Sequence, residues 1–210
     1  RRGAPLAFLV ADMPFGSYQA SDEQGFTNVA RMIQQSHCDA VKLEVGPTQL
    51  SLIRRLTDAG VPIMAHLGLR PQTVNLLGGY RTQGRTAEDA AEMVALALQM
   101  EQAGAATILL EAVPPEDAKA VVDRVGVPVI GCGAGPDCHG CVIVTHDGLG
   151  LTGSRPKFVP ALAELAEPFV AALRTYVEQV QSGEYPAAGH NYAMPADEVQ
   201  RLGRLLSKHP

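Results

Sequence analysis

The 210-residue sequence has no tryptophan, only four cysteines, and no apolar run of the roughly 18 residues that a membrane-spanning helix needs. The cysteines are too few and too clustered to form the disulfide framework of a secreted protein of this length. No run of Lys or Arg exceeds two residues and the net charge is -5, which argues against nucleic-acid binding and against a polybasic membrane patch. No signal-peptide cleavage pattern follows Arg1. These absences favour a cytosolic protein that acts on small molecules.

The sequence alternates between two kinds of segment. Six short apolar runs have the pattern of strands buried on both faces: Leu6–Asp12, Ala40–Val45, Pro62–Leu69, Ala106–Val113, Pro128–Gly133 and Val142–His146. Segments of helical period lie between and after them: Ser21–Ser36, Thr48–Ala59, Ala87–Ala103, Pro115–Val125, Phe158–Leu165, Pro168–Val180 and Ala196–Leu206. Ser21 and Thr86 are expected to cap two helix starts, and Gly60 and Gly104 to end two helices. This alternation predicts repeated βα units and a parallel sheet.

Such units build either an open doubly wound sheet or a closed (β/α)8 barrel. Polar side chains follow most of the predicted strands, as a barrel active site requires: Asp12, Lys42 with Glu44, His66, Glu111, and His146 with Asp147. An open sheet would instead concentrate its chemistry at one switch point. We therefore expect a barrel in a single domain over residues 1–210, with a C-terminal helical extension from about residue 157. Six strands do not close a barrel of eight, so one or two βα units are expected upstream of Arg1.

Three carboxylates end predicted strands, namely Asp12, Glu44 and Glu111. Each would be costly in an apolar setting unless it is paired, bound to a metal or placed at an active-site mouth; the alternative is a strand end that meets solvent. Converging carboxylates suit a hard cation such as Mg²⁺, and the third can serve as a base. Lys42 shares a strand face with Glu44, so it can hold a substrate carboxylate or pair with an acidic neighbour. His66 is either a structural histidine or part of the site.

Other segments give weaker signals. The connection Arg70–Arg85 is long enough to be a lid or binding loop, or simply a solvated one. The glycine-rich segment Gly131–Gly135 follows a strand and can approach an anion, but it lacks the spacing of a nucleotide-binding loop. Cys138 and Cys141, with His139 between them, look like half of a zinc site, with only Cys132 and His146 to complete it. There is no Gly-x-Ser-x-Gly motif to support a serine hydrolase.

Several motifs together resemble one enzyme family in order along nearly the whole chain. They are Asp12-Met13-Pro14-Phe15-Gly16-Ser17-Tyr18, Val41-Lys42-Leu43-Glu44, His66-Leu67-Gly68-Leu69-Arg70-Pro71-Gln72, Gly78–Arg85, Leu110–Pro114, Gly131–Pro136 and Tyr192-Ala193-Met194-Pro195. The sequence is similar to the ketopantoate hydroxymethyltransferases, whose fold is a (β/α)8 barrel of the phosphoenolpyruvate/pyruvate superfamily. The fold that this resemblance implies agrees with the one expected from the alternation of strands and helices.

The resemblance implies transfer of a one-carbon unit from 5,10-methylenetetrahydrofolate to 3-methyl-2-oxobutanoate, which gives ketopantoate for pantothenate synthesis. It implies Mg²⁺ bound by Asp12 and Glu44, substrate contacts from Asp12, Lys42 and His66, and Glu111 as the general base. It also implies a homo-oligomer. The family's upstream Gly-Asp-Ser segment, which supplies a further metal ligand, has no counterpart in these 210 residues. Two alternatives therefore stay open: a different carbon–carbon lyase of the same superfamily, and an incomplete, non-catalytic barrel.

Overall fold

The computed structural model describes residues 2–75 and 78–207 of the chain. Its centre is one six-stranded parallel sheet in which every strand lies beside the next one in sequence, in the order β1-β2-β3-β4-β5-β6. The strands are β1 (Val10–Asp12), β2 (Ala40–Glu44), β3 (Ile63–Gly68), β4 (Thr107–Glu111), β5 (Val129–Cys132) and β6 (Gly140–Cys141). Because the order never reverses, the sheet has no topological switch point, which separates it from the doubly wound folds.

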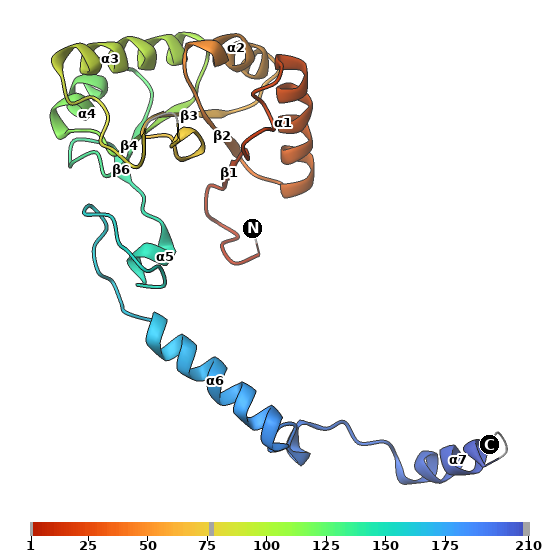
Figure 1. The fold of residues 1–210 in the computed structure, drawn as a ribbon. Helices are drawn as coiled ribbons and strands as arrows, with labels where there is room; N and C mark the ends of the chain where they lie inside the picture. Colours follow the sequence, from red (N-terminus) through yellow and green to blue (C-terminus); the bar gives the residue numbers. More distant parts are fainter. Residues whose placement is uncertain (1, 76–77, 208–210) are drawn as a thin grey trace. The chain divides into compact units, whose positions relative to one another are not determined.

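The connecting helices lie on one face of this sheet (Figure 1). They are α1 (Asp22–Ser36), α2 (Leu50–Asp58), α3 (Ala87–Gln102) and α4 (Pro115–Val122), with short 3-10 turns η1 (Pro47–Gln49) and η2 (Pro71–Thr73). Crossovers of one hand between neighbouring strands put every helix on the same side, as in a (β/α) barrel. The sheet is thus part of such a barrel, and its other face is the interior surface.

Apolar side chains between the sheet and the helices form the core. Their burial explains why the sequences of the strands are continuous apolar runs. In β2, Val41 and Leu43 are fully buried, as are Ile63 and Leu67 in β3 and Ile108 in β4. Burial on both faces selects apolar residues at nearly every position of a parallel strand. The predicted strands are confirmed for β1 to β5, with ends that differ by at most four residues.

The helix ends follow their predicted signals. The Ser21 and Thr86 hydroxyls accept hydrogen bonds from the amides of Gln24 and Asp89, so both cap their helices. Gly60 and Gly104 follow α2 and α3 with positive φ angles of 86° and 95°. These turns end each helix directly before the next strand.

Two predicted elements are wrong. The run Val142–His146 is not a strand; β6 forms two residues earlier because Gly140 and Cys141 align with Ile130 and Gly131 of β5. Val142 and Val144 are 48% and 55% exposed, and the chain turns into α5 (Thr145–Gly148). The helix predicted over Phe158–Leu165 does not form either. Pro160 lies inside that segment, and a proline disfavours the helical conformation of the residue before it, here Val159.

The chain divides into two compact units. The first comprises residues 1–145 and 156–160 and holds the sheet with α1 to α4. The second comprises residues 146–155 and 161–210 and holds α6 (Ala166–Ser182), η3 (Ala188–His190) and α7 (Ala196–Leu206). Helices α6 and α7 expose apolar side chains, including Phe169 and Leu173 in α6 and Leu205 in α7. In the described part of the chain, no helix combines the length and the apolar character needed to cross a membrane.

Candidate active site at the strand ends

Four of the predicted site residues form a continuous row across four neighbouring strands. Nζ of Lys42 lies 2.9 Å from Oδ1 of Asp12 and 3.3 Å from Nδ1 of His66. Nε2 of His66 in turn lies 3.3 Å from Oε2 of Glu111. The row therefore runs from a carboxylate on β1 through an ammonium and an imidazole to a carboxylate on β4.

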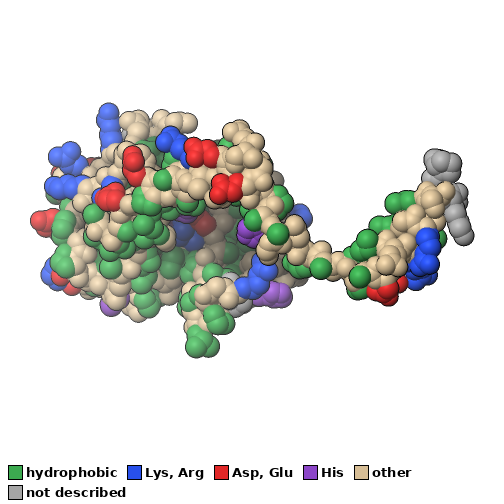
Figure 2. Space-filling model, turned by 90° about the horizontal axis from the view of Figure 1, so that it is seen from below, with side chains coloured by type: hydrophobic (Ala, Val, Ile, Leu, Met, Phe, Trp, Pro, Cys, Tyr) green, Lys and Arg blue, Asp and Glu red, His purple; other side chains and the backbone are tan. Residues whose placement is uncertain are grey.

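Strand register explains why these side chains meet. Asp12 is aligned with Lys42, Glu44 with His66, and Gly68 with Glu111. Because side chains alternate between the two faces of a strand, aligned residues and those two positions away share a face. Figure 2 views the molecule from the side opposite the helices and shows basic, acidic and histidine side chains gathered in a recess of that face.

The row has a buried centre and an exposed end. The His66 side chain is 1% exposed and those of Lys42 and Glu111 are each 18% exposed, whereas that of Asp12 is 56% exposed. An ammonium group has only donors, so Lys42 must donate to Nδ1 of His66, which then accepts. The neutral imidazole consequently carries its proton on Nε2, on the side of Glu111. No acceptor in the described residues meets that nitrogen in hydrogen-bonding geometry, and the Glu111 carboxylate is the acidic group beside it.

Glu44 lies at the end of β2 and is held separately from the row. It is 7% exposed, and its carboxylate accepts the amide proton of Gln72 at 3.1 and 3.2 Å. Burial raises the pKa of Glu44, while the hydrogen bond from the Gln72 amide and the nearby Lys42 ammonium act in the opposite direction. A buried carboxylate with a raised pKa gains free energy when a cation binds beside it.

The residue directly after Glu111 has an unusual backbone conformation. Ala112 has a φ of 48°, and this left-handed conformation is held by hydrogen bonds from its amide to the Cys132 carbonyl at 2.9 Å and from the Gln83 amide to its carbonyl at 3.0 Å. The Leu69 amide donates to the Glu111 carbonyl at 2.8 Å. Backbone strain of this kind in a non-glycine residue concentrates at functional sites.

The other predicted candidates lie elsewhere. His146 and Asp147 lie in α5 rather than at a strand end, because the sixth strand forms earlier in the chain. The Nδ1 atom of His139 accepts the Val129 amide proton at 2.9 Å, which gives this histidine a role in the fold. Arg70 donates to the Val45 carbonyl at 3.1 Å, while residues 76–77 of the predicted lid lie outside the described residues. Within residues 2–75 and 78–207, no three His, Cys, Asp or Glu side chains cluster closely enough to hold a metal ion.

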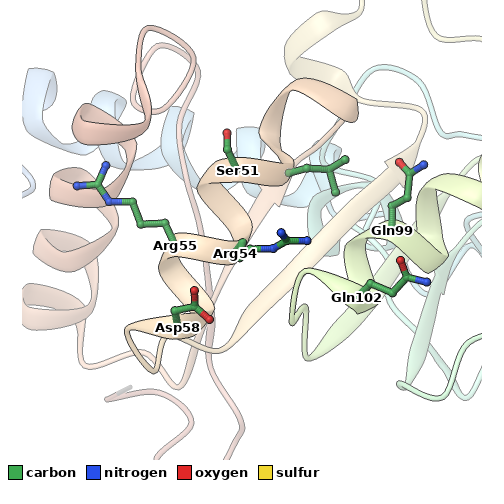
Figure 3. Close-up of a pocket in the computed structure, with 7 residues that line it drawn as sticks. Ser51, Arg54, Arg55, Asp58, Gln99 and Gln102 are labelled. Carbon is green, nitrogen blue, oxygen red and sulfur yellow. The ribbon is translucent and has the colours of Figure 1, made fainter.

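Two surface hollows lie apart from the row of site residues. One, of about 600 Å³, separates α2 from α3 and is lined by Leu50, Ser51, Arg54, Arg55, Asp58, Gln99 and Gln102 (Figure 3). Arg55 points away from it toward α1, where it pairs with Glu23 at 3.0 Å. The second, of about 500 Å³, lies between the ends of β2 and β3 and α3 and includes Arg70, Asp89 and Glu92. Neither contains a residue of the row, so the strand ends remain the candidate site.

Tyr18 and Gln72 are site residues to which the sequence pattern assigned no role. Tyr18 contacts the backbone of Glu44, and Gln72 contacts its carboxylate. Both lie in turn-rich segments that have neither helical nor strand period. Their only signal was membership of motifs shared with a known family.

A parallel sheet in sequential order defines a (β/α)-barrel protein, and the acids and bases on four neighbouring strands are its candidate active site. The chain matches the ketopantoate hydroxymethyltransferase family over residues 1–188. A relative from Thermoanaerobacter sp. (strain X514), "3-methyl-2-oxobutanoate hydroxymethyltransferase", is 43% identical over 94% of this chain and 72% of its own length. One of the same name from Geobacillus thermodenitrificans is 46% identical over 94% of this chain and 71% of its own length. The chain therefore belongs to the ketopantoate hydroxymethyltransferase family.

Among solved structures, a 2,3-dimethylmalate lyase described as a member of the PEP mutase/isocitrate lyase superfamily is similar to this chain. The two are 20% identical, with a TM-score of 0.44 over 95% of this chain and 66% of the lyase. A likeness this distant says nothing about the reaction that this chain performs.

Proposed function

We propose that the protein transfers a hydroxymethyl group from 5,10-methylenetetrahydrofolate to 3-methyl-2-oxobutanoate and so produces ketopantoate, the first step of pantothenate synthesis. The observation that carries this proposal is the row of Asp12, Lys42, His66 and Glu111 across the four neighbouring strands β1 to β4. It combines a carboxylate base with cationic and hydrogen-bonding groups that suit a 2-oxo acid. The names of the relatives supply the substrate class.

In this proposal Glu111 is the general base. Its carboxylate removes the proton from C3 of the oxo acid, and the electron pair of the broken C–H bond delocalises into the 2-oxo group. C3 then forms a bond to the methylene carbon of the folate, both C–N bonds of that carbon break, and water supplies the hydroxyl oxygen. Tetrahydrofolate leaves with the proton taken from C3 on one nitrogen and a proton of the water on the other. Lys42 and His66 contact the carboxylate and oxo oxygens of the substrate. The positive charge of Lys42 and the N–H group of His66 offset the negative charge that develops there.

Asp12 and Glu44 are the proposed Mg²⁺ ligands, and Asp12 also contacts the substrate. Their chemistry fits the ion, because Mg²⁺ takes one or two carboxylates and fills its remaining positions with water and substrate oxygens. The buried carboxylate of Glu44, with its raised pKa, supports this assignment. When bound, Mg²⁺ would polarise the oxo acid and make its C3 proton more acidic.

The test is exchange of the C3 proton of 3-methyl-2-oxobutanoate for deuterium, followed by NMR in D2O with Mg²⁺ and without folate. We expect exchange by the wild-type protein and a loss of about 100-fold or more in Glu111→Gln, since a positioned base contributes that much. Glu116→Gln removes an equal charge from an exposed position in the next helix and should exchange at the wild-type rate. Equal rates in Glu111→Gln and wild type would refute the assignment of the base.

A wild-type protein that neither exchanges the proton nor binds the oxo acid would instead indicate a non-catalytic barrel. Exchange with other 2-oxo acids but not with 3-methyl-2-oxobutanoate would indicate another carbon–carbon lyase. We also expect a cytoplasmic homo-oligomer, since the exposed apolar side chains of α6 and α7 are of a kind that subunit contacts cover. Light scattering of the purified protein measures the subunit number.

A further inference from the structure

The hydrogen-bond ladder between β1 and β2 is interrupted directly beyond the aligned pair Asp12 and Lys42. The Met13 amide donates to the Lys42 carbonyl at 3.0 Å, as a parallel ladder requires. The next bond of such a ladder would run from the Glu44 amide to the Met13 carbonyl. It is replaced: the Glu44 amide donates to the Tyr18 hydroxyl at 3.1 Å, and the Met13 carbonyl accepts from Nε2 of Gln72 at 2.7 Å.

Tyr18 and Gln72 join these two separated groups to each other. The Tyr18 hydroxyl lies 3.0 Å from Oε1 of Gln72 and 3.1 Å from the Glu44 carbonyl, and its single proton can serve either acceptor. A continuous chain of hydrogen bonds therefore leads from Glu44 through both side chains to Met13. Buried backbone groups that have lost a ladder partner must be satisfied in this way.

The two side chains are held firmly enough to act as a spacer. Tyr18 is 3% exposed, so its ring is packed in the core and its hydroxyl is held in place. The chain returns to this point through a turn in which the Ser17 amide donates to the Pro14 carbonyl at 3.2 Å. Gln72 in η2 is fixed at both ends, because its side-chain oxygen also accepts from Gln19 and its backbone amide binds the Glu44 carboxylate.

We propose that Tyr18 and Gln72 are positioning residues whose side chains, inserted between the ends of β1 and β2, set the spacing and orientation of the Asp12 and Glu44 carboxylates. This inference rests on the proposed function, because it gives the two carboxylates their role as a shared cation site. A continued ladder would bring the two strand ends together and leave less room between them. Neither positioning residue needs to touch the ion or the substrate.

The experiment measures Mg²⁺ affinity by isothermal titration, with and without 3-methyl-2-oxobutanoate, for three variants. Tyr18→Phe keeps the buried ring and removes the hydroxyl, and Gln72→Met keeps the length and removes the amide. Tyr176→Phe is the matched control because Tyr176 lies in α6, in the second compact unit, and is 51% exposed. We expect the first two to weaken Mg²⁺ binding by about tenfold or more, as losses of groups that orient metal ligands do, and the control to match wild type. Under saturating Mg²⁺ the exchange rate should largely recover.

Urea unfolding of the same variants separates positioning from a purely structural role. If Tyr18→Phe and Gln72→Met are less stable but bind Mg²⁺ as tightly as the folded wild type, the inference is overturned while the proposed function stands. If the wild-type protein itself binds no Mg²⁺ and exchanges no proton, the proposed function and the inference fail together. Should one variant not fold, the other decides the outcome by the same comparison.

Discussion

Asp117 offers a sharp test of the physical account of this fold, because its carboxylate is buried without a partner. It is 3% exposed, and neither side-chain oxygen has a hydrogen bond within the described part of the chain. The third residue of a helix normally reaches back to the amide of the capping residue, but the cap of α4 is Pro114, which has none. A Cβ atom on Gly84 would overlap the carboxylate, so the loop packs closely against it.

Burial, with a further contribution from the negative charge of Asp89, raises the pKa of Asp117 from 3.8 to about 6. The folded protein then binds this proton more tightly than the unfolded chain does. Stability should fall as the pH rises through the window between these two pKa values and stay level above it. Because the pKa rises by about two on folding, ionisation of Asp117 should make the free energy of unfolding about 3 kcal/mol lower at neutral pH than at acidic pH.

Asp117→Asn removes the charge and keeps the shape. We expect it to stabilise the protein by up to about 3 kcal/mol near pH 8, and this advantage to shrink by about 1 to 1.5 kcal/mol near pH 5. Urea unfolding followed by circular dichroism measures both values, since the chain has no Trp to report by fluorescence. Other groups titrate equally in both proteins and cancel in the difference. Exposed Glu116, changed to Gln, is the control and should give a small change that does not depend on pH. An Asp117→Asn advantage that is absent, or constant with pH, would refute the reasoning.

Two further substitutions test the row and its backbone. Gly68→Ala should lower the free energy of unfolding in urea by about 3 kcal/mol or more, because a Cβ at φ +85° would overlap the Glu111 carbonyl. Gly60→Ala is the control: Gly60 has a φ of +86° but open space around it, so the change should cost only about 1 to 2 kcal/mol. Similar costs for the two variants would contradict the close approach of Gly68 to Glu111. Lys42→Met should raise the KM for the oxo acid about tenfold or more. It should also cost about 1 to 3 kcal/mol in unfolding free energy, because Nδ1 of the buried His66 loses its donor. An unchanged KM would contradict the assignment of Lys42 as a substrate contact.

The sequence was informative where one physical constraint acts alone. Strands buried on both faces must be apolar, so β1 to β5 were predictable. Polar residues within or at the end of such apolar runs marked Asp12, Lys42, His66 and Glu111. The run beginning at Val142 misled because its apolar side chains are half exposed and the register of β5 decides where β6 forms.

Tyr18 and Gln72 could not be found by the same reasoning. Their positions depend on where a turn returns the chain, which no period in the sequence encodes. Their contacts are to backbone groups of residues far away in sequence, 26 positions for Tyr18 to Glu44 and 59 for Gln72 to Met13. Only the folded structure reveals that the ladder between two strands is interrupted there.

The placement of the row on four separate strands has a consequence for folding. Each member lies tens of residues from the next in sequence, from Asp12 to Lys42, His66 and Glu111, and parallel strands pair only after the intervening helix has crossed over. Contacts this distant form late and slowly. We therefore expect the row to be incomplete in a nascent or partly folded chain, because its members come together only as the sheet forms.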